Sequence, residues 1–159
     1  MEKLESLIGK YPFFRGMRAR HLKEITRHAA RVTFRAGEAI FEDGERADRF
    51  YLLMDGRIVV ELYSPGYQDL LIQTLSAGDV LGWSWLVPPY QWRFNARAIA
   101  QTHAVGFDAR RLRALCDRDQ ELGYEIQKRF LIVITARVES ASLQLLDLYG
   151  LPGKSKKTR

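Results

Sequence analysis

Turn-forming residues recur at short intervals between residues 32 and 108, and this spacing limits what the chain can fold into. The runs between them are rich in Val, Ile, Leu, Phe and Tyr and alternate with period two, which is typical of short antiparallel strands. The turns are marked by Gly37, Gly44, Asp55-Gly56, Pro65-Gly66 and Gly78. The predicted strands lie near 32–35, 38–41, 49–54, 57–63, 68–76, 80–82, 93–100 and 102–108. Eight such strands indicate a jelly roll, whose interior can hold a small ligand.

Helical spacing on both sides of this region predicts flanking helices. A short helix is expected at Leu4, Leu7 and Ile8, and a second is expected to continue to about Ala30. After the last strand we expect a helix over 109–118 and a long helix over roughly 119–149. Apolar residues of the long helix recur at the spacing of a two-helix seam, namely Ile134, Val138, Ala141, Leu145 and Leu148. The sequence predicts one mainly β domain over 1–149 and a symmetric homodimer through about 130–149.

The charge distribution does not favour nucleic-acid binding by the domain. The chain of 159 residues carries a formal net charge of +6, and four of these charges lie at Lys154, Lys156, Lys157 and Arg159. Residues 150–159 are therefore expected to form a basic flexible tail, and the rest of the chain carries only +2. The single cysteine, Cys116, excludes an intrachain disulfide and fits a reducing compartment. With no apolar run long enough to cross a bilayer, we expect a cytoplasmic protein without a membrane partner.

The stretch from Gly78 to Ala100 has the features of a ligand cradle. At Gly82 the backbone can approach a bound group closely, and the N–H groups of Gly82, Trp83 and Ser84 at the start of a helical turn favour an anion such as phosphate. Arg93 could bring a fixed positive charge to the same turn. The three tryptophans, Trp83, Trp85 and Trp92, either stack on a bound base or belong to the core.

The segment from Ile40 to Gly56, IFEDGERADRFYLLMDG, resembles the first signature of the cyclic-nucleotide-binding domain in the catabolite activator and Fnr regulator superfamily. Only Phe41 departs from that signature, where a smaller residue is usual. The resemblance extends over about residues 5–149 and implies that the long helix is a dimerisation helix. In the transcription factors of this superfamily a winged helix-turn-helix follows, and residues 151–159 are too few for one. We therefore expect a stand-alone sensor without direct operator recognition.

The phosphate-binding cassette of that family is altered in this sequence. The resemblance implies a glycine at Gly82, followed by a glutamate that accepts from the ribose, and an arginine for the cyclic phosphate. Trp83 stands in place of the glutamate, and an indole N–H donates but does not accept. The phosphate arginine corresponds either to Trp92 or, with a loop one residue different in length, to Arg93. The strand register decides between these two positions.

Two functions remain open from the sequence. The first is a small-ligand-sensing regulatory module, with Gly82, Trp83, Ser84, Trp85, Trp92 and Arg93 as ligand-binding residues and cyclic AMP or cyclic GMP as the leading ligand. The second is a dimeric protein-interaction scaffold whose degenerate pocket binds no nucleotide. A haem held by His103 or Cys116 is a weaker third option. The sequence contains no arrangement typical of a catalytic triad, a paired-carboxylate cleft, a phosphate loop or a metal site, so we expect a non-enzyme without a bound metal.

Overall fold

The computed structural model describes residues 2–150, so the predicted tail from residue 151 onward lies outside the described residues. Two antiparallel four-stranded sheets form a β-roll, with the strand orders β1-β8-β3-β6 and β2-β7-β4-β5. The strands are β1 (Ala29–Phe34), β2 (Ala39–Phe41), β3 (Arg49–Leu53), β4 (Ile58–Leu62), β5 (Leu70–Leu75), β6 (Val80–Leu81), β7 (Asn95–Ala98) and β8 (Thr102–Asp108). The helices are α1 (Leu4–Ile8), α2 (Ala19–Thr26), the short 3-10 turn η1 (Ser84–Leu86), α3 (Ala109–Arg118) and α4 (Gln120–Leu148). The predicted jelly-roll architecture with a long C-terminal helix is confirmed.

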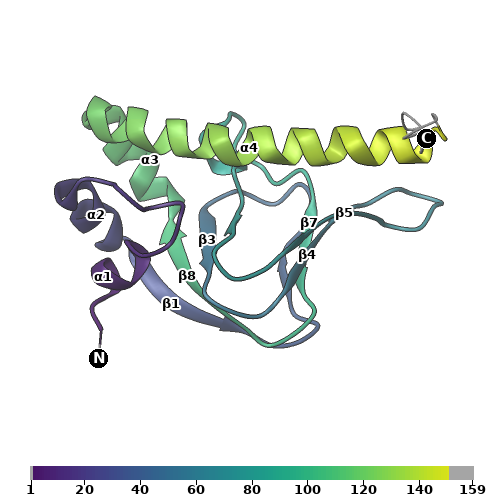
Figure 1. Ribbon diagram of the computed structural model, residues 1–159, viewed down its shortest axis with the longest axis horizontal. Helices are drawn as coiled ribbons and strands as arrows, with labels where there is room; N and C mark the ends of the chain where they lie inside the picture. The colour runs from purple at the N-terminus through teal and green to yellow at the C-terminus, as the bar shows by residue number, and fades with distance from the viewer. Residues whose placement is uncertain (1, 151–159) are drawn as a thin grey trace, which may run out of the picture.

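The long helix α4 runs along one side of the β-roll, while α1, α2 and α3 gather at one end of the molecule (Figure 1). The loop between β4 and β5 extends at the other end, below the C-terminal part of α4 (Figure 1). A hydrogen bond joins β5 to α4 near this end, where the side-chain amide of Gln144 donates to the carbonyl oxygen of Ile72 at 3.3 Å. The helix therefore spans the length of the roll and contacts it near both ends.

The end of α2 corrects the predicted helix boundary. The helix ends at Thr26, and Ala29 and Ala30 already belong to β1, where they pair with Phe107 and Gly106 of β8. Alanine is compatible with either helix or strand, and the hydrogen bonds that a long partner strand offers decide the outcome here. The prediction that the second helix continues to about Ala30 is therefore wrong.

Aromatic side chains form the centre of the core. Phe50 stacks on Phe107 with ring centroids 4.5 Å apart, and Trp85 also stacks on Phe50, with centroids 4.9 Å apart. Phe130 of α4 meets both Phe50 and Trp85 edge-on. Because these rings come from strands, from η1 and from α4, they fix the N-terminal half of α4 to the roll.

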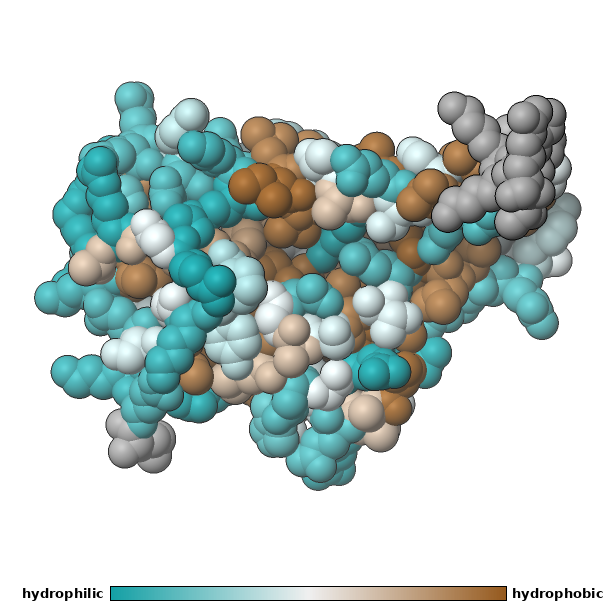
Figure 2. All heavy atoms as spheres, in the orientation of Figure 1, coloured by the Kyte–Doolittle hydropathy of each residue, from teal (hydrophilic) through white to brown (hydrophobic). Residues whose placement is uncertain are grey.

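The C-terminal half of α4 has no comparable covering. Leu122, Ile126 and Phe130 are buried, whereas Val138 is 59% exposed and Leu145 52% exposed. Apolar side chains are visible along this helix on the surface of the molecule (Figure 2). Within the part of the chain that the structure describes, no helix is both long and apolar enough to cross a membrane.

Candidate functional site

Gly82 follows the last residue of β6 and lies two residues before the turn η1. Its φ of +98° lies in the left-handed region that glycine adopts without strain. Trp83 precedes the first residue of η1, and Ser84, which is buried, begins that turn. The local backbone thus has the predicted form of a glycine followed by a short helical turn.

Trp92 occupies the space that faces Gly82. A Cβ atom at position 82 would lie 2.5 Å from Cη2 and 2.8 Å from Cζ3 of the Trp92 ring. The same ring stacks on Phe41, with centroids 3.8 Å apart and an angle of 7° between the planes. Trp92 is therefore packed against both Gly82 and Phe41, and only 5% of its surface is exposed.

The cavity that remains beside Gly82 has a volume of only about 20 Å³. It is lined by four of the predicted site residues, Gly82, Trp83, Ser84 and Trp92, and by Phe41, Val60, Leu81, Phe94 and Arg137. Sites for small molecules usually have volumes of roughly 300–1,000 Å³, and a space of roughly 10–15 Å³ admits one water molecule. In this conformation the cavity has room for little more than a water molecule.

The other two predicted site residues lie elsewhere. Trp85 is fully buried in the aromatic core, and its carbonyl oxygen accepts a hydrogen bond from Nη1 of Arg113 at 2.9 Å. Arg93 is exposed and does not line the cavity beside Gly82. Of the two positions considered for the phosphate arginine, the one that faces the interior carries Trp92. The role of all six residues in ligand binding stays a prediction.

Five lining residues were not predicted for this site, namely Phe41, Val60, Leu81, Phe94 and Arg137. Phe41 had a signal in the sequence, since it is the one residue that departs from the family signature. The structure gives that departure a physical reason, because the Phe41 ring stacks on the Trp92 ring. The large residue at 41 and the tryptophan at 92 thus fill the interior together. Arg137 had no such signal, because it lies far along the chain on α4.

Arg137 brings a positive charge from α4 to the edge of the roll. Its Nη2 donates to the carbonyl oxygen of Val80 in β6. Burial lowers the pKa of Arg137 to about 10, and the nearby Asp79 carboxylate only partly opposes that shift. The side chain therefore stays charged at neutral pH. Within residues 2–150, no group of three or more His, Cys, Asp or Glu residues is placed to hold a metal ion.

A β-roll of two antiparallel sheets, with a glycine turn at its interior and a long helix along its side, defines a class of regulatory domain. Sequence comparison gives the family within that class. Residues 31–119 match the cyclic nucleotide-binding domain, and the chain belongs to this family of the catabolite activator and Fnr superfamily.

Relatives of known structure or role agree with this family. The chain is 24% identical over 157 residues to the CRP-like cAMP-activated global transcriptional regulator of Mycobacterium tuberculosis, covering 97% of this chain and 68% of that protein. A solved structure from Geobacter metallireducens, assigned as a cyclic nucleotide-binding protein, is 28% identical with a TM-score of 0.77, covering 87% of this chain and 99% of that one. The c-di-GMP responsive global regulator of Xanthomonas campestris shares the fold at 15% identity with a TM-score of 0.72, covering 84% of this chain and 66% of that one.

Proposed function

We propose that this chain is a regulatory module of the cyclic nucleotide-binding family in which Trp92 and Phe41 occupy the place of the nucleotide. In this proposal the module acts by associating with another protein chain through α4. It does not bind cyclic AMP or cyclic GMP tightly, as nucleotide-binding members of its family do. The observation that carries this proposal is the packing of Trp92 against Gly82 and Phe41, beside which a cavity of only about 20 Å³ remains. The module is non-enzymatic and cytoplasmic in this proposal, since its relatives include regulators.

The free energy of moving Trp92 supports this choice. A buried tryptophan side chain covers roughly 150–250 Å², so exposing it costs up to about 4–6 kcal/mol at about 25 cal/mol per Å². A ligand that needs Trp92 to leave would lose about a thousandfold or more in affinity. Trp83 also stands where the family glutamate would accept from the ribose, which removes a further favourable contact. A cyclic nucleotide of ordinary micromolar affinity would therefore bind only at about millimolar concentration.

The exposed apolar residues of α4 support association through this helix. Ile134, Val138, Ala141, Leu145 and Leu148 follow the spacing of a helix seam. In this single chain Val138 and Leu145 are more than half exposed, and Leu148 is 75% exposed. Pairing with the same helix of a second copy would remove these side chains from water. We propose a homodimer through about residues 130–149.

A second candidate is a ligand-sensing module in which Trp92 moves aside when a cyclic nucleotide enters. Membership of the family favours it, as does the M. tuberculosis relative, which is described as cAMP-activated. In that case the N–H groups near Gly82 and Ser84, with Arg93, would hold the phosphate, and Trp83 or Trp92 would stack on the base. The movement of Trp92 would then change the packing of the interior, and this change would shift the position of α4.

Calorimetric titration with cyclic AMP, cyclic GMP and cyclic di-GMP, followed in parallel by tryptophan fluorescence, separates the two candidates. We expect no saturable binding below about 100 µM for any of the three. Trp92→Ala, which opens the interior, should bind at least one of them more tightly than the unaltered protein does. Saturation of the unaltered protein at low micromolar concentration would refute the closed pocket. A sharp loss of that affinity in Arg93→Ala would then establish the second candidate.

A further inference from the structure

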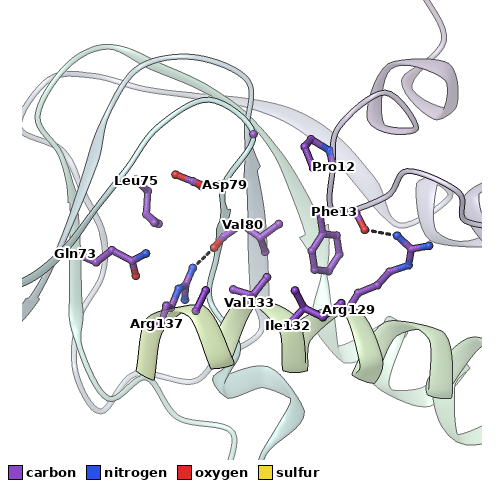
Figure 3. Close-up of a pocket in the computed structure, with 12 residues that line it drawn as sticks. Pro12, Phe13, Gln73, Leu75, Asp79, Val80, Arg129, Ile132, Val133 and Arg137 are labelled. Atoms are coloured by element: carbon purple, nitrogen blue, oxygen red, sulfur yellow. Dashed lines mark hydrogen bonds between the residues drawn. The ribbon is translucent and has the colours of Figure 1, made fainter. Parts of the chain in front are cut away.

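A second, larger cavity lies between α4, the segment before α2 and the turn between β5 and β6 (Figure 3). Its volume is about 310 Å³, which is at the lower end of the range for small-molecule sites. Most of its wall is apolar, from side chains that include Phe13, Leu75, Val80, Ile132 and Val133. An apolar wall of this size suits the hydrocarbon or aromatic part of a small molecule.

Arg137 stands at this wall with hydrogen-bonding capacity left over. Nη2 donates to the carbonyl oxygen of Val80, and this is the bond drawn for it in Figure 3. The Nε–H is buried without a hydrogen-bond partner among the described residues. In residues 2–150 no carboxylate lies within ion-pair distance of its guanidinium. A buried guanidinium without an anionic partner is costly, and an anion in the cavity would remove that cost.

The other charged residues of the cavity are already engaged. Arg129 donates to the carbonyl oxygen of Phe13 at 2.6 Å and pairs with Glu125 at 2.8 Å. The exposed Asp79 accepts a hydrogen bond from the backbone N–H of Ser76 at 2.9 Å, which ties its carboxylate to the turn. Asp79 disfavours a doubly charged ligand, since it adds a negative charge to the lining. Among the described residues that line this cavity, Arg137 is thus the guanidinium that keeps donors free for an anion.

We propose that this cavity binds a small amphipathic monoanion, with a carboxylate at Arg137 and an apolar body along α4. A carboxylate can accept from Nε–H and from one Nη–H of the same guanidinium at once, in the paired geometry that arginine favours. The apolar body would lie against Phe13, Ile132 and Val133. This site goes beyond the proposed function, because it is separate from the cavity beside Gly82 except for Arg137, which lines both.

The probes for the test are 4-phenylbutyrate and its uncharged counterpart 4-phenylbutanamide, titrated calorimetrically into the whole chain. We expect saturable binding of the carboxylate and binding of the amide weaker by about tenfold or more, because the charge-assisted pair is lost. Arg137→Met should reduce carboxylate affinity by a similar factor and leave amide affinity nearly unchanged. Lys128→Met is the matched control, since Lys128 is an exposed cation on α4 that does not line this cavity, and it should have no effect.

A second variant keeps the test independent of any effect of Arg137 on folding. Val133→Phe puts a larger side chain into the lining of this cavity and so fills part of it. Arg137 is kept, and Val133 does not line the cavity beside Gly82. This variant should abolish binding of both probes while thermal unfolding stays cooperative. The proposal is overturned if neither probe binds, if the amide binds as tightly as the carboxylate, or if Val133→Phe binds both normally. None of these results bears on the closed pocket at Trp92, which the nucleotide titrations test separately.

Discussion

At the scale of single residues, Gly82 has the most direct connection to the candidate site. Its φ of +98° disfavours any side chain, and a Cβ there would overlap the Trp92 ring. We expect Gly82→Ala to destabilise the protein by about 2–4 kcal/mol, measured by urea unfolding. Gly66→Ala is the control, because Gly66 has a similar φ of +80° but open space around it, and it should cost only about 1 kcal/mol. Equal losses of stability in the two variants would mean that Trp92 moves aside at little cost, which would contradict the closed pocket.

The same residues show how far the sequence determines the site. It predicted Gly82 as the point of close backbone approach, because only glycine lacks the Cβ that would prevent it. It left open whether position 92 or 93 faces the interior, because the length of the preceding loop sets that choice and a shift of one residue reverses it. The pairing of Phe41 with Trp92 could not be predicted, since it joins residues far apart in the chain. The sequence therefore singled out the turn at Gly82, while the contacts that fill the space beside it are visible only in the fold.

At the scale of secondary-structure elements, Asp119 links the start of α4 to α2. Its carboxylate accepts from the backbone N–H of Leu122 at 3.2 Å and from Nη1 of Arg20 at 2.9 Å. These contacts hold the pKa of Asp119 below its ordinary value, and the Leu122 N–H is the largest cause. The folded state thus binds the proton more weakly than the unfolded state does. The stability from Asp119 is therefore complete above the unfolded pKa of about 3.9 and is lost as pH falls below it.

We expect Asp119→Ala to lower Tm at about pH 7, and the difference from the unaltered protein to shrink as the pH is reduced below about 4. Asp119→Asn should lose less, because its amide oxygen still accepts from the Leu122 N–H. Thermal unfolding followed by circular dichroism at several pH values measures both effects. Equal losses in the two variants, or a difference independent of pH, would show that the cap and its charge do not stabilise α4.

Elements were easier to predict than their ends. The turn glycines separate the strands, so all eight strands were located, and β8 was predicted with its observed bounds, Thr102–Asp108. The strands predicted at 68–76 and 93–100 are shorter in the structure, as β5 (Leu70–Leu75) and β7 (Asn95–Ala98). The outer residues of both predictions fall outside the ladders of the observed sheet. The β-propensity of the residues indicates which segments form strands, whereas pairing with a neighbouring strand determines where each strand ends.

At the scale of the whole molecule, the proposed homodimer depends on apolar side chains that the C-terminal half of α4 exposes. Val138 and Leu145 are seven residues apart and so lie on one face of the helix, and both are more than half exposed. In a symmetric pair each would contact apolar side chains of the second copy, and a carboxylate there would lose its hydration without gaining a partner. We expect the double variant Val138→Asp with Leu145→Asp to weaken dimerisation by about a hundredfold or more.

Light scattering coupled to size-exclusion chromatography at micromolar concentration measures this change directly. Ser140→Asp is the matched control, because Ser140 is exposed on the opposite side of the same helix, and it should leave the mass unchanged. A monomeric unaltered protein would refute self-association through α4. A double variant that stays dimeric would place the interface elsewhere on the molecule.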